Sequence, residues 1–277
     1  MSPWFPDSAN AAELARRSVR AEGHADPVAS YLAALVDGDA DRLTTVWPGG
    51  VVVHDPRAGE VHGHHQLKRF IRESQRWLHD HHARIEVVAT TSVEGRAVVE
   101  MSAHLDGAHE ERWPVAVVAE APDPTSVVFR TYCSQSPVDG RRHVRPPLLA
   151  TDPAQPGGVV GRHLAALRAG DLDELVDTFA ADGCVQETRG PSRPRRGRDQ
   201  IRSFYADRLP GDGGIGVECC LQTDDGVRCA VEFTCDSWGA RAIPAQAGMI
   251  VLERGADGLL VAARLYDDIE EVSVASA

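Results

Sequence analysis

Hydrophobic positions in the first part of the chain follow the period of a helix and then the period of a strand. Apolar residues recur every three or four positions over 28–36, directly after Asp26-Pro27, a pair typical of a helix start. Asp39 can cap a second short helix, and a third is predicted near 64–79. Strand-like runs separated by turns follow. Helices first and an antiparallel meander afterwards are typical of an α+β domain.

This pattern occurs twice along the chain. Leu32 aligns with Leu164, and the spacing between equivalent residues stays constant as far as the Gly-Asp pairs at Gly38 and Gly170. Three blocks align in the same order: 31–47 with 163–179, 63–70 with 197–204, and 99–107 with 231–239. Ordered blocks of this kind indicate a tandem duplication.

A chain of 277 residues is long enough for two domains of ordinary size. We expect the two domains at 26–135 and 157–272, with a helical lead-in over 1–25. The segment 136–156 is rich in proline and glycine, a composition typical of a linker between domains.

Composition and charge exclude several classes of protein. The formal net charge of −12 argues against a general nucleic-acid binder, which needs a basic face for the phosphates. No apolar run approaches the length that spans a bilayer, and the N-terminal sequence lacks the order of a secretory signal. We therefore expect a cytoplasmic protein without membrane contact, whose six cysteines are reduced and mostly buried.

Three motifs of the first copy carry a resemblance to a known family. YLAALVDGDADRL (31–43), VVVHDPRAG (51–59) and HGHHQLKRF (62–70) resemble the ketosteroid isomerase and SnoaL-like polyketide cyclase branch of the nuclear-transport-factor-two-like superfamily. The resemblance implies two cone-shaped α+β domains, each a curved, mostly antiparallel sheet with three N-terminal helices. The superfamily hosts isomerases, cyclases, dehydratases and binding modules, so the fold alone does not assign the chemistry.

The resemblance implies a catalytic pair in the first copy. Asp55 falls where the isomerases keep the carboxylate that moves a proton between carbons, and Tyr31 falls where they keep a tyrosine that binds the substrate carbonyl oxygen. Such a pair works because the enolate left by proton abstraction needs a donor in a dry site; ketosteroid isomerase is itself a standard example. The family's protonated aspartate aligns near Ala116, where no acid is present.

The second copy differs at both positions. His163 replaces the tyrosine, and CVQETRG places Thr188 over Asp55, with Glu187 one residue earlier. His163 and Glu187 can form an acid/base pair, because imidazole titrates near neutral pH. Alternatively, one copy is catalytic and the other structural.

Each candidate also has a purely structural interpretation. Asp-Pro is common in turns, so Asp55 can be a turn former. Tyr31 and His163 lie on apolar helix faces and can be core residues with satisfied polar atoms. The remaining residues that we predict to contact a substrate are His54, Trp47, Met101, Trp113 and Tyr132.

The histidines of the first copy lie in two groups, at the start and at the end of the helix predicted near 64–79. At about 1.5 Å per residue these groups are some 20 Å apart and cannot share one ion. Histidines near a helix C-terminus also complement the helix dipole. We therefore predict neither a metal site nor a cofactor.

Strand alternation predicts which residues face the cone. If Val99, Met101 and Ala103 face inward, the residues between them face outward. In the family this outer face is a dimer surface, so the two copies are expected to pack there as an internal pseudo-dimer, and the chain could be monomeric.

We favour a cofactor-independent acid/base enzyme (an isomerase, cyclase or dehydratase) that acts on a hydrophobic carbonyl compound, as in natural-product biosynthesis. All three reactions share proton abstraction next to a carbonyl. The alternative is a non-catalytic protein that binds small molecules or serves as a scaffold.

Overall fold

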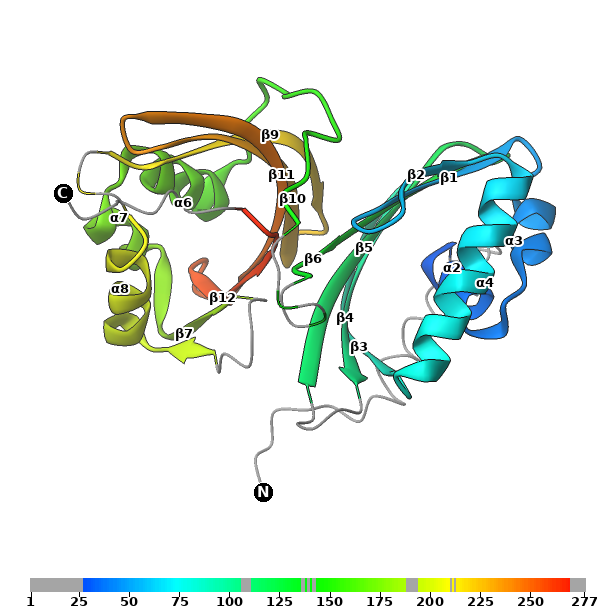
Figure 1. The fold of residues 1–277 in the computed structure, drawn as a ribbon. Helices are drawn as coiled ribbons and strands as arrows, with labels where there is room; N and C mark the ends of the chain where they lie inside the picture. Colours follow the sequence, from blue (N-terminus) through cyan, green and yellow to red (C-terminus); the bar gives the residue numbers. More distant parts are fainter. Residues whose placement is uncertain are drawn as a thin grey trace. The chain divides into compact units, whose positions relative to one another are not determined.

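The structure is a computed structural model that describes residues 27–105, 111–135, 138, 140, 143–187, 194–209, 211 and 213–269. The chain divides into two compact units, Met1–Cys133 and Ser134–Ala277. In each unit, described helices come before the first strand and between the second and third strands of a six-stranded mixed sheet. The predicted pair of α+β domains is therefore confirmed (Figure 1).

In the first unit, three helices and six strands are described. They are α2 (Pro27–Asp37), α3 (Ala40–Val46), β1 (Gly50–Asp55), β2 (Gly59–His62), α4 (His64–Asp80), β3 (Arg84–Val93), β4 (Arg96–Leu105), β5 (Glu111–Asp123) and β6 (Ser126–Cys133). The sheet order is β2-β1-β6-β5-β4-β3. Only the β1–β6 pair is parallel among the described pairs, so the sheet is mostly antiparallel, as predicted.

The second unit repeats this order. Its elements are α6 (Gly158–Ala169), α7 (Leu172–Asp177), β7 (Phe179–Glu187), β8 (Arg195–Arg196), α8 (Arg198–Ala206), β9 (Ile215–Asp224), β10 (Arg228–Trp238), β11 (Arg241–Arg254) and β12 (Leu260–Tyr266). The sheet order is β8-β7-β12-β11-β10-β9, again with one parallel pair, β7 with β12. The largest difference is the third helix: α4 has 17 residues and α8 has 9.

Local sequence signals explain the helix boundaries. Asp39 caps α3 through its carboxylate, which accepts the backbone N–H groups of Asp41 at 3.0 Å and Arg42 at 3.3 Å. Gly38, with φ of 73°, allows the left-handed turn that ends α2. Val36, which we predicted on the apolar face of α2, is instead 56% exposed. It lies roughly 80° around the helix from Val28, at the edge of the buried stripe.

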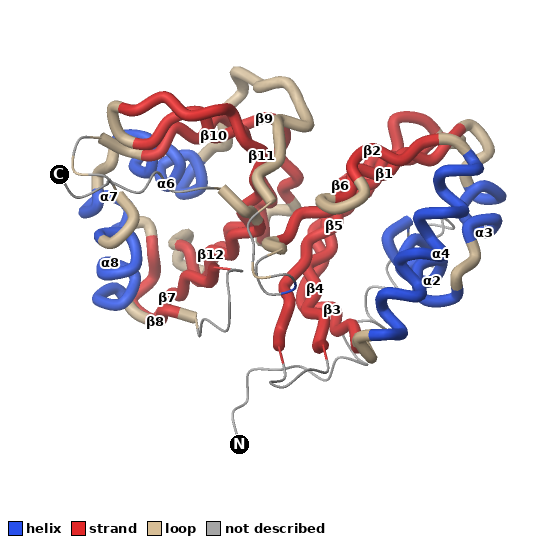
Figure 2. The backbone as a smooth tube through the Cα atoms, in the orientation of Figure 1, coloured by secondary structure: helices blue, strands red, loops and turns tan. Residues whose placement is uncertain are grey.

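The helices of each unit cover one face of its own sheet, as the tube in Figure 2 shows. In the first unit a buried cluster includes Phe129 and Val99 of the sheet and Leu67 of α4. Along β4, Met101 and Ala103 line the interior, so the residues between them lie on the opposite face, as the alternation predicts. The packing of the two units as an internal pseudo-dimer stays a prediction.

The segment after β6 is tied to the second unit by backbone hydrogen bonds. The Asp268 carboxylate accepts the N–H groups of Gln135 at 2.8 Å and His143 at 2.9 Å. The Ala247 N–H donates to the Arg145 carbonyl at 2.9 Å. The described part of the predicted linker 136–156 is therefore anchored rather than fully solvated. None of the described helices is both long and apolar enough to span a membrane.

Candidate active site in the first unit

The first unit has a cavity of about 400 Å³ between its helices and the inner face of its sheet. This volume is usual for a small-molecule site. The apolar lining includes Leu32, Leu35, Phe70, Trp77, Met101, Trp113, Val115 and Val117, and the polar lining is Tyr31, Asp55, Arg57, Glu73, Ser74 and Thr131. The cavity is thus a mainly apolar chamber with a few convergent polar groups.

Asp55 ends β1 at the edge of this cavity. Its Oδ1 accepts the backbone N–H groups of Arg57 and Ala58, both at 2.9 Å, so the carboxylate closes the turn between β1 and β2. The structural interpretation of Asp55 is therefore correct. It is also compatible with a functional one, because a carboxylate has a second oxygen and Asp55 lines the cavity.

Tyr31 comes from α2 and is almost fully buried. Its ring stacks on Phe129 with centroids 4.3 Å apart, which fixes the direction of the phenol group. Burial and, to a lesser extent, the negative charge of Asp55 raise the pKa of Tyr31 far above its ordinary value, whereas a hydrogen bond with the Thr131 side chain acts in the opposite direction. Tyr31 is therefore a neutral hydrogen-bond donor near a carboxylate, in a cavity with apolar walls.

The described part of the fifth strand contributes no acid to the cavity. Trp113, Val115 and Val117 face inward, and Ala116 lies between them on the other face of the sheet. The position that aligns with the family's protonated aspartate therefore points away from the cavity, and its inward neighbours are valines. Residues 113–117 of β5 therefore supply no carboxylic acid that could donate a hydrogen bond to an oxyanion in this cavity.

Of the other residues predicted to contact a substrate, Met101 and Trp113 line the cavity, whereas Trp47, Tyr132 and His54 do not. Trp47 packs edge-on against Phe129, with ring centroids 5.9 Å apart, inside the core. Tyr132 and His54 adjoin cavity residues along their strands, and successive strand residues point to opposite faces.

Sequence reasoning missed several residues of the cavity. Thr131 lies one residue before Tyr132, and the alternation along β6 could have identified it, because Phe129 also faces inward. Arg57 follows Asp55 in the turn, and its guanidinium lies over the Trp77 ring, 5.5 Å from the centroid. No sequence signal links Arg57 to Trp77, since the two residues are far apart along the chain.

Strand register defines which residues of the second unit are equivalent to these. His54 lies opposite Arg130 in the first unit, and Gln186 lies opposite Arg264 in the second. Arg130 and Arg264 are themselves equivalent, because each begins an Arg-X-Tyr sequence near the end of its strand.

Glu187 therefore occupies the position of Asp55. The predicted alignment, which placed Thr188 there, is wrong by one residue, and Thr188 lies outside the described residues. Glu187 forms an ion pair with Arg208, and the Arg208 guanidinium also lies 3.8 Å from the centroid of the Phe204 ring. The counterpart of Asp55 thus has an arginine beside it.

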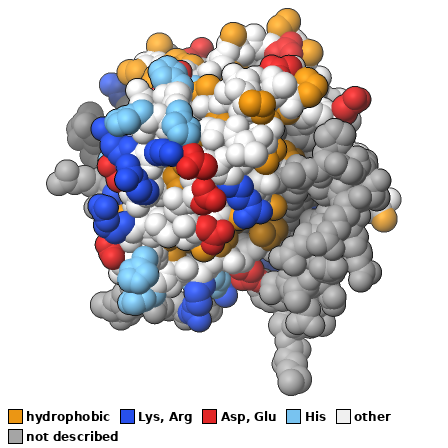
Figure 3. All heavy atoms as spheres, turned by 90° about the vertical axis from the view of Figure 1, so that its right-hand side faces the viewer, with side chains coloured by type: hydrophobic (Ala, Val, Ile, Leu, Met, Phe, Trp, Pro, Cys, Tyr) orange, Lys and Arg blue, Asp and Glu red, His pale blue; other side chains and the backbone are white. Residues whose placement is uncertain are grey.

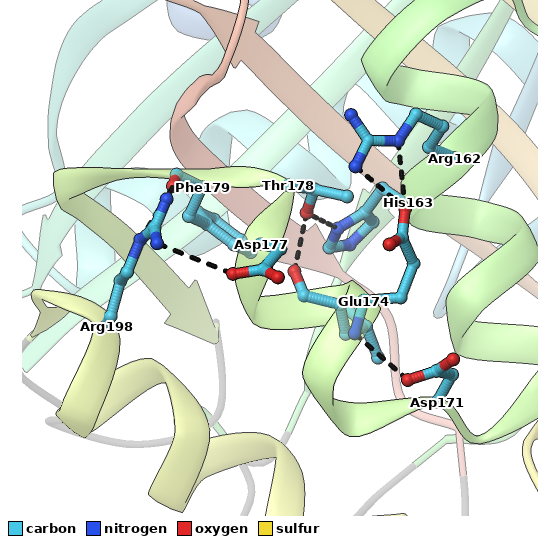
Figure 4. A network of polar contacts seen from close by, with 9 residues as sticks. Arg162, His163, Asp171, Glu174, Asp177, Thr178, Phe179 and Arg198 are labelled. Atoms are coloured by element: carbon cyan, nitrogen blue, oxygen red, sulfur yellow. Dashed lines mark hydrogen bonds and ion pairs between the residues drawn. The ribbon is translucent and has the colours of Figure 1, made fainter.

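His163, at the position of Tyr31, is fully buried and hydrogen-bonded through both ring nitrogens. Its Nδ1 lies 3.0 Å from Thr178 Oγ1 (Figure 4), and its Nε2 lies 3.3 Å from the Tyr205 hydroxyl. Thr178 donates its own hydroxyl proton to the Leu175 carbonyl at 2.6 Å, so His163 Nδ1 is the donor to Thr178, and Nε2 accepts from Tyr205. Burial lowers the pKa of His163 to about 3. The imidazole is a neutral core group.

At two positions that line the first cavity, the interior of the second unit carries bulkier apolar side chains. Phe233 replaces Met101, and its ring lies over Gly248, where an added Cβ would be 2.4 Å from the ring. Leu265 replaces Thr131 and packs against the core. A hollow of about 380 Å³ in this unit is lined by residues of β8, of α8 and of the turn after it, and includes neither His163 nor Glu187.

Histidine and acidic side chains do not gather into a metal site in the part of the chain that the structure describes. On the face shown in Figure 3, histidines lie in separate groups among basic and acidic side chains. Exposed histidines here pair with acids instead: His64 lies 3.4 Å from Asp41, and His62 lies 3.2 Å from Glu60.

Comparisons with known proteins agree with the architecture. The model of the SnoaL-like domain family matches residues 28–133 and again residues 160–263. The chain therefore belongs to the SnoaL-like domain family, as a tandem of two such domains. Cyclases and isomerases are among the proteins of this fold family.

Three solved structures that are similar to this chain each cover less than half of it. One is a hypothetical protein with a ketosteroid isomerase-like fold from Catenulispora acidiphila, in complex with trimethylamine (20% identity, 43% of this chain and 91% of that chain, TM-score 0.36). Another is a putative polyketide cyclase from Sinorhizobium meliloti (18% identity, 39% and 92%, TM-score 0.32). A third is an uncharacterized cystatin fold protein from Novosphingobium aromaticivorans (17% identity, 39% and 93%, TM-score 0.33).

Proposed function

We propose that the first unit is a cofactor-independent acid/base enzyme for a hydrophobic carbonyl compound, with Asp55 as the base and Tyr31 as the hydrogen-bond donor. The observation that carries this proposal is the convergence of a carboxylate and a neutral buried phenol on one largely apolar cavity. The two groups supply what proton transfer next to a carbonyl requires.

The chemistry needs only these residues. The Asp55 carboxylate takes a proton from the carbon next to the carbonyl, so the C–H bond breaks and an O–H bond forms. The electron pair moves onto the carbonyl oxygen, which becomes an enolate that accepts a hydrogen bond from the Tyr31 hydroxyl. Return of the proton from Asp55 to another carbon gives an isomer. Attack of the enolate carbon on a second carbonyl forms a C–C bond, and the resulting alkoxide takes the proton from Asp55 to give a cyclised alcohol. The apolar walls strengthen both steps because they exclude water.

The second unit has no such pair in this account. His163 is neutral and donates and accepts within the core, and Glu187 is held by Arg208. We propose that this unit is structural, and that the sequence prediction of a second acid/base pair at His163 and Glu187 does not describe its role. Natural-product biosynthesis is the setting that we propose for the substrate, because ring closure and isomerisation of polyketide-like carbonyl compounds need this chemistry.

The test is exchange of hydrogen for deuterium next to a carbonyl. The full chain is incubated in D₂O with 2-tetralone, a bicyclic ketone with acidic C–H bonds, and deuterium uptake is followed by NMR. We expect the wild-type chain to accelerate exchange, and Asp55→Asn to lower that rate by about 10²–10⁴. Exchange by Asp55→Asn at the wild-type rate would contradict the assignment of the base. Binding of 2-tetralone without any exchange would favour the alternative, a non-catalytic binding protein.

A further inference from the structure

Thr131 is the polar side chain among the cavity-lining residues of strands β4, β5 and β6, which are otherwise apolar. It lies on β6 opposite Val117 of β5, and it is 8% exposed. Phe129 lies two residues earlier on the same face of the strand and carries the Tyr31 ring. Thr131 is thus held by the strand that also supports the phenol.

The Thr131 side chain hydrogen-bonds the Tyr31 hydroxyl. Both hydroxyls line the same cavity, and a threonine hydroxyl can donate its proton to a phenol oxygen. In that arrangement Tyr31 accepts from Thr131 and keeps its own proton for a ligand oxygen in the cavity. Hydrogen bonds in such a chain strengthen one another.

The second unit provides an independent comparison. At the position of Thr131 it has Leu265, and at the position of Tyr31 it has His163. His163 takes its partners from Thr178 and Tyr205 instead. The hydroxyl of β6 is therefore absent where the phenol is absent. This joint change is expected if Thr131 serves Tyr31, and is not required if Thr131 only fills space in the core.

We propose that Thr131 is a positioning residue of the first unit: it directs the Tyr31 hydroxyl proton into the cavity and strengthens that hydroxyl as the donor to a ligand oxyanion. Together the two hydroxyls take the place of the carboxylic acid that β5 lacks. This proposal rests on the proposed function for its catalytic meaning, but the hydrogen-bond arrangement can be tested without catalysis.

The test uses 4-nitrophenol, whose anion absorbs visible light and carries a negatively charged oxygen as an enolate does. Binding is measured with the full chain carrying Asp55→Asn, so that the carboxylate charge does not repel the anion. The pKa of the bound probe is read from absorbance against pH. We expect Thr131→Val to raise the pKa of the bound probe by about 1, equivalent to about a tenfold loss of affinity for the anion.

Two further variants separate positioning from packing. Thr131→Ser keeps the hydroxyl and should restore the pKa of the bound probe to within a few tenths, whereas Tyr31→Phe should raise it at least as far as Thr131→Val does. Thr91→Val is the matched control, because Thr91 is buried, does not line the cavity, and its hydroxyl has no hydrogen-bond partner among the described residues. Thr91→Val should leave the pKa of the bound probe unchanged.

Three results would overturn the proposal: a probe pKa that Thr131→Val leaves unchanged, a shift that Thr131→Ser does not rescue, or no binding of 4-nitrophenol. The outcome is distinguishable from failure of the proposed function. Absence of deuterium exchange with 2-tetralone, together with the expected pattern of probe pKa values, would remove the enzyme assignment and leave Thr131 as part of an oxyanion-binding site.

Discussion

The two units share a strand order and differ at almost every polar position of their interiors. In the first unit Tyr31 and Asp55 border an open cavity, whereas in the second unit His163 is enclosed by hydrogen bonds and Glu187 is paired with an arginine. The difference shows that one strand order can border an open cavity in one copy and a hydrogen-bonded, ion-paired interior in the other.

The third helix shows the same divergence on a larger scale. In the first unit α4 extends far enough to place Trp77 and Leu78 on the cavity wall. In the second unit α8 ends at Ala206, so it supplies no equivalent wall. Arg208, just beyond this helix, occupies the position of Ser74 and reaches Glu187. Residues that differ between the units can therefore be exchanged to test which of them make the site.

After the loss of the base in Asp55→Asn, the largest effect is expected for the donor. Tyr31→Phe removes the hydroxyl that would hold the enolate and should lower the rate of deuterium exchange into 2-tetralone by about 10²–10³. Stacking on Phe129 should keep the ring in place, so the free energy of unfolding should change little. An unchanged exchange rate would show that another group binds the oxyanion.

A smaller loss is expected when the first unit receives the arginine of the second. Ser74→Arg would place a guanidinium near Asp55, as Arg208 stands near Glu187, and should lower the pKa of that carboxyl and weaken it as a base. We expect exchange to slow by about 100-fold. In the reverse change, Arg208→Ser, exchange should stay at the wild-type rate; a comparable loss there would indicate that the second unit takes part.

The buried histidine predicts a pH dependence of the second unit. The pKa of His163 is lowered to about 3, while a histidine in the unfolded chain titrates near 6.5. Between these values the unfolded state binds a proton that the folded state does not, so stability falls as the pH drops from about 6.5 towards 3. His163 should account for a loss of about 2 kcal/mol between about pH 6.5 and about pH 5.

Urea unfolding of the wild-type chain and of His163→Gln at these two pH values measures this contribution. The variant should be less stable at the higher pH, because it loses the bonds to Thr178 and Tyr205, and should depend less on pH. An identical pH dependence in both proteins would mean that the imidazole is already accessible to protons in the folded state.

The smallest effect is expected from filling the first cavity. Met101→Phe introduces the residue that the second unit has at this position, and its ring should occupy part of the cavity of about 400 Å³. Binding of 4-nitrophenol, followed by quenching of the Trp77 and Trp113 fluorescence, should weaken by about tenfold. Phe233→Met is the matched control and should leave this binding unchanged.

The fold could be predicted from the sequence because its signals are local and occur twice. The cap at Asp39, the glycine at Gly38 and the apolar spacing of α2 each specify a boundary, and the repeat confirms them independently. The pair at Tyr31 and Asp55 was reached only through the family resemblance, since nothing in the spacing of these residues shows that both line one cavity.

The parts that could not be predicted depend on register and on long-range packing. A one-residue error placed Thr188 in the position of Glu187, and Tyr132 was predicted to contact a substrate although its neighbour Thr131 lines the cavity. Such slips reverse the face on which a side chain lies. The partners of Glu187 and His163 come from α8 and the turn after it, and no local pattern specifies which of these residues reach them.

The most direct test of the central claim, that only the first unit carries an acid/base site, compares the two equivalent acids in one assay. Deuterium exchange into 2-tetralone is measured for the wild-type chain, for Asp55→Asn and for Glu187→Gln. We predict that Asp55→Asn lowers the exchange rate by a factor of about 10²–10⁴. Glu187→Gln should keep the wild-type rate, even though it removes the charge that pairs with Arg208. Equal losses in the two variants, or a loss confined to Glu187→Gln, would contradict it.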